Sequence, residues 1–172
     1  MSKEEKVNRR EFLFTASYTV GAVGVGAVVW PLIHQMNPDK AQQALATTEV
    51  DISQVEPGKS ITVLWRGKPV FLKRRTPEEI VEARAVNLQE LPDPQKDEER
   101  VKEGRDEWLV MLGVCTHLGC VPLKDKGDYK GWFCPCHGSH YDGSGRIRKG
   151  PAPKNLEIPK FEFVDNNTIK IG

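Results

Sequence analysis

The chain has 172 residues, enough for one compact domain and a membrane anchor. Its 25 basic and 24 acidic residues nearly cancel, so the charge does not suggest a nucleic-acid-binding protein. The four cysteines are too few for a disulfide-stapled scaffold, and they are clustered rather than dispersed. The sequence therefore indicates one domain with a membrane anchor and a single site formed by the clustered cysteines.

An uncharged stretch near the N-terminus predicts a membrane anchor over residues 12–34. Phe12 to Ile33 runs 22 residues without a charge. A helix of that length spans roughly 33 Å, which matches a hydrocarbon core about 30 Å thick. The stretch is longer than the ~7–15 apolar residues of a cleaved signal peptide, so we expect a retained single-pass helix. Cleavage after the downstream run Ala44-Leu45-Ala46 is the alternative.

Residues 1–11 form a basic segment that is expected to stay in the cytoplasm, because basic residues accumulate on the cytoplasmic side of a span. Only Lys40 follows the span closely on its other side. The run NRREFL at 8–13 resembles a twin-arginine export signal, although an ordinary basic flank would explain its arginines equally well. The twin-arginine route carries proteins that have already folded. The motif predicts a bacterial protein. The basic residues before the span are Lys3, Lys6, Arg9 and Arg10.

Residues 35–48 are predicted to be a flexible linker. They contain no aromatic residue, and Pro38 discourages continuation of the preceding helix. The linker is either a passive spacer or a hinge that lets the following domain move. The residues alone favour neither.

The next segment, up to residue 114, reads as a β-rich scaffold. Alternating or β-branched runs predict strands at 50–52, 61–65 and 70–72, the last two as a hairpin. Thr76 followed by Pro and Glu predicts a capped helix at 76–85. Residues 108–114 form the most apolar strand and lead directly into the first cysteine.

Two further segments complete the scaffold. Residues 93–107 carry eleven charges in fifteen positions, which predicts a solvated surface segment, with disorder as the alternative. Runs at 156–158, 161–163 and 168–171 alternate and predict closing antiparallel strands.

All four cysteines and three of the four histidines lie between residues 115 and 140. Each half of the cluster mixes thiols with an imidazole, whereas zinc sites more often pair Cys with Cys and His with His. Two ordinary disulfides are the other alternative, and His140 is expected to be a bystander. A diiron cluster with two thiolates on one iron and two imidazoles on the other fits the mixed halves best.

The motifs CTHLGC at 115–120 and CPCHGS at 134–139 resemble the Rieske iron–sulfur family without a departure. The resemblance implies a mainly β fold, an antiparallel Rieske β-sandwich over 49–172 that follows one N-terminal transmembrane helix. It also implies a smaller cluster-binding subdomain at about 113–155, and a Rieske-type [2Fe–2S] cluster as cofactor.

The resemblance also assigns the ligands, which ligand chemistry alone does not, since it cannot choose between Cys134 and Cys136. One iron is bound by Cys115 and Cys134, and the other by His117 and His137. The remaining cysteines, Cys120 and Cys136, are expected to form a disulfide, which points to an oxidising compartment.

Further residues around the cluster take roles from the same resemblance. Ser139 is expected to hydrogen-bond a bridging sulfide and Tyr141 the sulfur of Cys115, which raises the reduction potential. The GPAP run at 150–153 is expected to be a third loop that covers the cluster. The surface that docks on other subunits is expected to include Leu118, Gly138 and Pro151.

Within the family, the run WRGKP at 65–69 and the run at 134–153 resemble the iron–sulfur subunits of respiratory ubiquinol–cytochrome c reductases. Residues 93–107 resemble a segment that is ordered in those subunits. The photosynthetic plastoquinol–plastocyanin reductase counterpart matches these segments less well. An oxygenase would need a second, mononuclear iron site, and the fourth histidine, His34, lies at the membrane.

This resemblance implies a redox subunit that works only within its complex. A quinol bound in cytochrome b would give one electron to the cluster and one proton to a cluster histidine, His137 or else His117. The resemblance also favours a hinge at 35–48, on which the domain would swing to pass the electron to a c-type cytochrome and so contribute to proton translocation. The expected setting is a dimeric complex in the bacterial inner membrane, with the cluster domain in the periplasm. The alternatives are a tethered Rieske electron carrier outside any quinol-oxidising complex, and the plastoquinol–plastocyanin counterpart.

Overall fold

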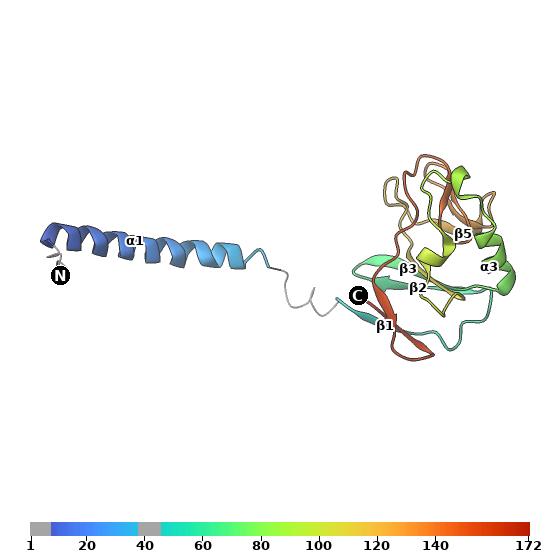
Figure 1. Ribbon diagram of the computed structural model, residues 1–172, viewed down its shortest axis with the longest axis horizontal. Coiled ribbons are helices and arrows are strands. Elements are labelled where there is room, and N and C mark those ends of the chain that lie inside the picture. The colour runs from blue at the N-terminus through green and yellow to red at the C-terminus, as the bar shows by residue number, and fades with distance from the viewer. Residues whose placement is uncertain (1–7, 38–45) are drawn as a thin grey trace, which may run out of the picture. The chain divides into compact units, whose positions relative to one another are not determined.

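A computed structural model of the chain describes residues 8–37 and 46–172 (Figure 1). The chain divides into two units, one ending at Gln43 and one beginning at Ala44. Most of the predicted basic segment and most of the predicted linker lie outside the described residues.

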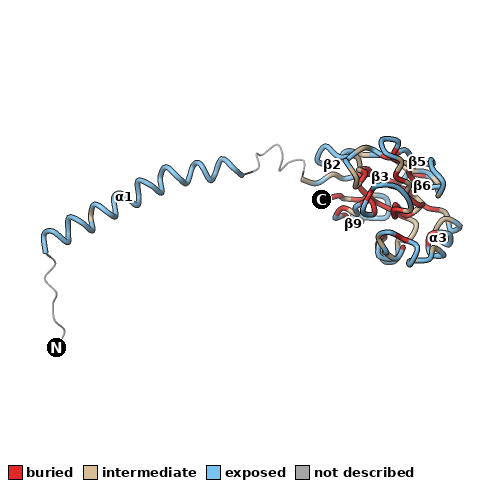
Figure 2. Tube along the Cα trace, turned by 90° about the horizontal axis from the view of Figure 1, so that it is seen from above, coloured by how far each residue is buried: buried red, intermediate tan, exposed pale blue. Residues whose placement is uncertain are grey.

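The described part of the N-terminal unit, residues 8–37, forms one helix, α1 (Arg9–His34), of 26 residues. It begins before the predicted span because Asn8 caps it: the Asn8 side chain accepts from the Arg10 N–H, and Glu11 reaches back to the Asn8 N–H. None of its residues is buried, and Figure 2 shows it exposed along its length. The helix is long and apolar enough to cross a membrane, with a mean hydropathy of 1.7, which agrees with the predicted N-terminal apolar helix.

The C-terminal unit is built from three antiparallel sheets, as the prediction of a mainly β fold required. The first sheet has the order β1 (Thr48–Asp51), β10 (Thr168–Ile171), β9 (Phe161–Phe163). The second has the order β2 (Ser60–Trp65), β3 (Lys68–Arg74), β4 (Trp108–Leu112). The third has the order β5 (Leu123–Lys126), β6 (Gly131–Cys134), β7 (Ser139–Tyr141), β8 (Ile147–Lys149).

The second sheet is the middle layer (Figure 1), and its strands β3 and β4 bury side chains on both faces, whereas β2 leaves one face exposed. Side chains alternate along a strand, so Leu72 and Val110 face the first sheet while Phe71 and Met111 face the third. All five residues of β4 are buried for this reason. The strand thus carries the chain from the interior directly to the first cysteine loop.

Local sequence signals place the hairpin and the helix as expected. The β2–β3 turn holds Arg66 and Gly67 at φ +51° and +73°, the conformation that tight two-residue hairpin turns need. Helix α3 (Pro77–Arg84) starts with the predicted capping box, in which Thr76 and Glu79 bond each other's backbone N–H.

The strand predicted at 156–158 is wrong, because this segment joins no sheet. It runs between two layers and bonds to each in turn. The Leu112 N–H donates to the Glu157 carbonyl (2.8 Å), and the Leu156 N–H donates to the Gly145 carbonyl (2.9 Å). The apolar residues alternate here because the segment is buried between two layers, and not because it pairs with another strand.

The expectation that residues 93–107 are a solvated segment is wrong at two positions. The segment contains the 3₁₀ helix η2 (Asp97–Arg100), which follows the short 3₁₀ helix η1 (Leu88–Glu90). Asp97 and Arg100 are buried, with 1% and 2% exposure. Asp97 pairs with Arg75 (2.6 Å), and Arg100 donates to the Ser144 and Leu156 carbonyls (2.7 Å each). These partners lie far away in the sequence, so the sequence pattern did not reveal them.

Candidate metal centre

Two loops of similar construction carry the cysteines and histidines. The first follows β4, and the Gly119 N–H closes it by donating to the Cys115 carbonyl (2.9 Å). The second follows β6, and the Gly138 N–H donates to the Cys134 carbonyl (3.0 Å). Both glycines have positive φ, +83° and +75°, which other residues adopt only with strain. Each loop therefore starts at a cysteine and turns back four residues later, with its histidine inside.

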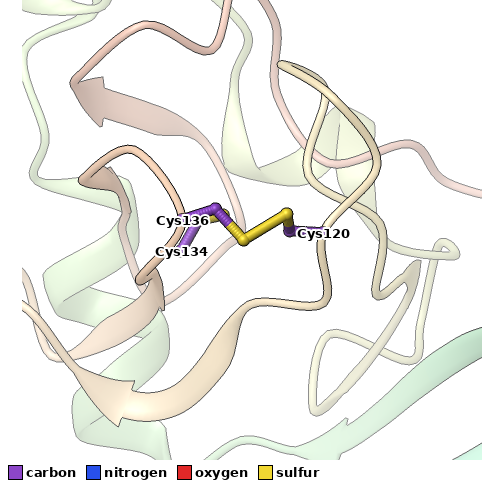
Figure 3. Close-up of side chains that lie close together, drawn as sticks. All are labelled: Cys120, Cys134 and Cys136. Atoms are coloured by element: carbon purple, nitrogen blue, oxygen red, sulfur yellow. A yellow bond between two sulfur atoms is a disulfide. The ribbon is translucent and has the colours of Figure 1, made fainter.

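The structure sorts the four cysteines, all of which it describes. Cys120 and Cys136 form a disulfide between the two loops, as predicted (Figure 3). The sulfur of Cys134 lies within 4.8 Å of both, yet it stays a free thiol, and Cys115 is free as well. Both free cysteines are buried. Of Cys134 and Cys136, between which ligand chemistry could not choose, Cys134 is the one that remains a thiol.

The two loop histidines face one another. The rings of His117 and His137 are 4.6 Å apart between centroids and nearly perpendicular, at 85°. Nδ1 of His117 is buried and has no hydrogen-bond partner among the described residues. A buried, unpaired nitrogen is unfavourable in a folded protein unless it binds something else. His137 is exposed, so one imidazole is inside the site and the other opens to the surface.

The third histidine of this region has a structural place. Nδ1 of His140 accepts a hydrogen bond from the Asp128 N–H (3.1 Å), and its ring packs edge-on to Phe133. It therefore fixes the turn between β5 and β6, in line with the expectation that it is a bystander.

The two free thiols differ in their electrostatics. Burial opposes ionisation of Cys115, but hydrogen bonds, first among them that of the Tyr141 hydroxyl, hold its pKa below the ordinary value. Burial and a hydrogen bond with Cys115 raise the pKa of Cys134. A bound metal would deprotonate both. Two buried thiols and two facing imidazoles, one of which has the unpaired buried nitrogen, are the donor set that a Rieske [2Fe–2S] cluster requires, so the residues fit that group.

The predicted tuning hydroxyls lie next to the free thiols. The Tyr141 hydroxyl is 3.3 Å from the Cys115 sulfur, and burial together with that contact raises its pKa, so it stays protonated as a donor. Ser139 is 1% exposed, and its oxygen accepts from the Ala152 N–H (3.2 Å).

Two contacts around these hydroxyls were not predicted. The Thr116 N–H donates to the Tyr141 oxygen (3.3 Å), and the Ala152 N–H donates to Ser139. Thr116 lies between two predicted ligands, Cys115 and His117, and this position could have indicated that it contacts the site. Nothing in the sequence marked Ala152, because a backbone donor leaves no trace in residue type.

The residues predicted to dock are accessible. Leu118 is 71% exposed, Pro151 is exposed and Gly138 is half-buried. A Cβ on Gly150, which precedes Pro151, would lie 2.6 Å from the Gly138 carbonyl oxygen. The GPAP run therefore touches the second cysteine loop, as a covering third loop would.

Comparison with known proteins gives two matching family models. Residues 1–39 match a model described as "Ubiquitinol-cytochrome C reductase Fe-S subunit TAT signal". Residues 48–162 match the Rieske [2Fe-2S] domain, which confirms the predicted cofactor class.

Curated relatives and a solved structure agree with these matches. Ubiquinol-cytochrome c reductase iron-sulfur subunits from Rhodospirillum rubrum and Bradyrhizobium diazoefficiens are 58% and 54% identical. The alignments cover 96% and 99% of this chain and 92% and 98% of those proteins. A chain of "Hyperthermophilic respiratory Complex III" is 30% identical, with a TM-score of 0.54, over 90% of this chain and 97% of its own length. The chain belongs to the Rieske [2Fe-2S] family, among the ubiquinol–cytochrome c reductase iron–sulfur subunits.

Proposed function

We propose that the chain is the iron–sulfur subunit of a bacterial quinol–cytochrome c oxidoreductase. It takes one electron and one proton from a quinol held by cytochrome b and passes the electron to a c-type cytochrome, as the redox subunit of a dimeric complex that translocates protons. The observation that carries this proposal is the pairing of buried thiols with two imidazoles, one of which is exposed. Relatives of the same length carry the corresponding name.

The ligand roles are those that the family resemblance implies, and the two free thiols and the two facing imidazoles support them. Cys115 and Cys134 would hold one iron, and His117 and His137 would hold the other. A bound [2Fe–2S] cluster supplies one-electron redox chemistry, with a potential raised by its imidazole ligands. Both thiols are buried and so are shielded from solvent.

His137 is the residue that meets the quinol. Its ring is exposed, whereas His117 is half-buried, so a quinol hydroxyl reaches the ring of His137 more readily. Leu118, 71% exposed, together with Gly138 and Pro151 forms the apolar surface that docks on cytochrome b.

The N-terminus stays in the cytoplasm and the cluster domain faces the periplasm. The excess of basic residues before α1, the match to a TAT signal model and the Cys120–Cys136 disulfide support this topology. Replacing Arg9 and Arg10 with lysine in the full chain is expected to leave the domain on the cytoplasmic side. Protease protection in spheroplasts measures this, and an exported domain in that variant would contradict the twin-arginine route.

The linker at 35–48 is proposed to be a hinge between the anchor and the cluster domain. Proline substitutions at Gln42 and Gln43 are then expected to slow turnover of the complex with the cluster content unchanged. Undiminished turnover would make the segment a passive spacer.

The deciding experiment purifies the tagged chain from membranes. We expect cytochrome b and a c-type cytochrome to accompany it, and quinol to reduce the cluster, with an EPR spectrum that responds to quinone-site inhibitors. If the chain instead purifies alone and its EPR spectrum ignores those inhibitors, it is a tethered electron carrier outside any quinol-oxidising complex.

A further inference from the structure

The segment from Gly150 to Lys154 bonds two hydroxyls beside the thiols, and in opposite senses. The Ala152 N–H donates to the Ser139 oxygen (3.2 Å), while the Lys154 carbonyl accepts from the Thr116 hydroxyl (2.6 Å). A backbone N–H can only donate and a carbonyl can only accept. The backbone therefore fixes the direction of both hydrogen bonds.

This direction matters for Ser139, because a hydroxyl has one hydrogen and two lone pairs. The Ala152 N–H occupies one lone pair, so the hydrogen cannot point at Ala152. Ser139 is 1% exposed, which leaves little access for water. Ser139 pairs with Cys134 across the β6–β7 ladder, which places its side chain on the same face of the sheet as that free thiol. The hydroxyl hydrogen is thereby directed to the sulfur side of the site.

Thr116 shows the opposite case. Its only hydroxyl hydrogen is used by the Lys154 carbonyl, so it has none to offer toward the sulfur atoms. The same short segment thus keeps one hydroxyl as a donor to the metal centre and withdraws another from that role.

Gly150 allows the segment to lie this close. It has a φ of +106°, and a Cβ there would lie 2.6 Å from both the Gly138 carbonyl oxygen and the Ser139 Cα. Any larger residue must push the segment away from β7, because real Cβ atoms do not approach backbone atoms so closely. The Ala152 N–H would then move away from the Ser139 oxygen.

We propose that Gly150 and Ala152 are positioning residues for the reduction potential of the cluster, because they orient the Ser139 hydroxyl so that it donates to a cluster sulfur. The inference rests on the proposed function, since Ser139 tunes a potential only where that cluster is bound. Loss of this orientation removes a hydrogen bond that favours the reduced, more negative cluster, and so lowers the potential.

The test is a double-mutant cycle on the full chain in its membrane complex, with midpoint potentials from EPR-monitored redox titration. Gly150→Ala is expected to lower the midpoint by no more than Ser139→Ala does. Combined with Ser139→Ala it is expected to cause no further shift. Gly143→Ala is the matched control, because a Cβ there meets nothing within 4 Å, and its midpoint should equal that of the wild type.

Equal shifts caused by Gly150→Ala with and without the Ser139 hydroxyl would overturn the inference, because the glycine would then act by another route. An unchanged midpoint in Ser139→Ala alone would sink the tuning role itself, and this inference with it.

If Gly150→Ala lowers the cluster content, its midpoint cannot be compared with that of the wild type. Electron–nuclear double resonance of the reduced cluster in D₂O, in the wild type and in Ser139→Ala, then tests the orientation of the hydroxyl. An exchangeable proton coupling that is absent from Ser139→Ala supports the proposed orientation. The same spectrum from both proteins contradicts it.

Discussion

The first two sheets and the third sheet are stabilised by different means. Between the first and second sheets lies an apolar core that includes Val50, Leu72, Val110 and Ile169, none more than 7% exposed. Apolar packing is strong but has little directional preference. It fits a part of the molecule that has only to be stable.

The third sheet, which carries both cysteine loops, also has an apolar contact with the second sheet, but buried charges fix its position. Asp142 accepts from the Ser144 and Arg146 N–H groups (2.9 Å each) and pairs with the Arg146 guanidinium (2.8 Å). Arg146 also donates to the Ala83 carbonyl in α3 (2.7 Å). These bonds hold the turn that follows Tyr141.

Arg100 extends this network from η2 to the third sheet. It bonds the Ser144 carbonyl and the Leu156 carbonyl and is 2% exposed, and burial lowers its pKa to about 10. Burying charges in this way adds little net stability, but hydrogen bonds fix directions. The comparison suggests that apolar packing sets the stability of the scaffold, while polar bonds set the geometry around the metal.

The largest expected effect is that of Arg100→Met. The change leaves two buried carbonyls without their donor, at about 1–3 kcal/mol each, so it should destabilise the domain by about 2–6 kcal/mol, with loss of cluster content. Denaturant unfolding and EPR quantify both. Lys96→Met, at an exposed neighbouring position, is the matched control and should stay within about 0.5 kcal/mol. Equal destabilisation by the two changes would show that the hydrogen bonds of Arg100 do not stabilise the domain.

Leu72→Ala tests the other region. Its side chain is fully buried in the apolar core, and its loss should cost about 2–5 kcal/mol in unfolding free energy. The midpoint potential of the folded protein should stay at the wild-type value, because Leu72 faces away from the third sheet. A shifted midpoint would show that the two regions are not separable.

Cys120→Ser removes the bond between the two loops. The cysteines are 16 residues apart, so the loss should cost about 3 kcal/mol and make the cluster labile. The EPR spectrum of the remaining cluster should keep its ligand type. A changed ligand type would show that Cys120 or Cys136 is a ligand after all.

The ion pair of Asp97 with Arg75 predicts sensitivity to acid. Burial alone would raise the pKa of Asp97, but the Arg75 and Ser144 hydrogen bonds hold it below its ordinary value. A carboxyl with a depressed folded pKa contributes stability above its unfolded pKa of about 4, and this is lost as the pH falls through the folded pKa. Unfolding free energies measured between pH 6 and 2 should therefore fall less steeply in Asp97→Asn. Identical slopes would place the acid sensitivity elsewhere.

The smallest expected energy is that of the tuning hydroxyls. Ser139→Ala with Tyr141→Phe should keep the cluster but lower its midpoint, since each hydrogen bond contributes about 1 kcal/mol to the reduced form. Redox titration measures the shift. Tyr129→Phe is the control, because that ring lies beside His140 rather than the thiols. A midpoint unmoved in the double variant argues against tuning by these groups.

Local chemistry made part of this protein readable from its sequence. The uncharged run before residue 34, the Thr76 cap and the β2–β3 hairpin each depend on neighbours within a few positions. The paired motifs at 115–120 and 134–139 identified the site, because mixed thiols and imidazoles at short spacing are unusual.

Tertiary structure decided what depends on distant partners. The charges of Asp97 and Arg100 looked solvated until Arg75, Ser144 and Leu156 supplied their bonds. Apolar and polar residues alternate at 156–158 as in a strand, yet the segment bonds to two layers and joins neither sheet. A strand ladder and a buried ion pair both need a partner whose place only the folded chain defines.

The same distinction holds within the metal centre. Residue types named its cysteines and histidines, but chemistry alone could not say which of Cys134 and Cys136 stays a thiol. The disulfide to Cys120 settles that, because it joins the two loops in space. The direction of the Ser139 hydroxyl depends on a backbone N–H of Ala152, a donor that almost every residue carries, so only the fold could reveal it.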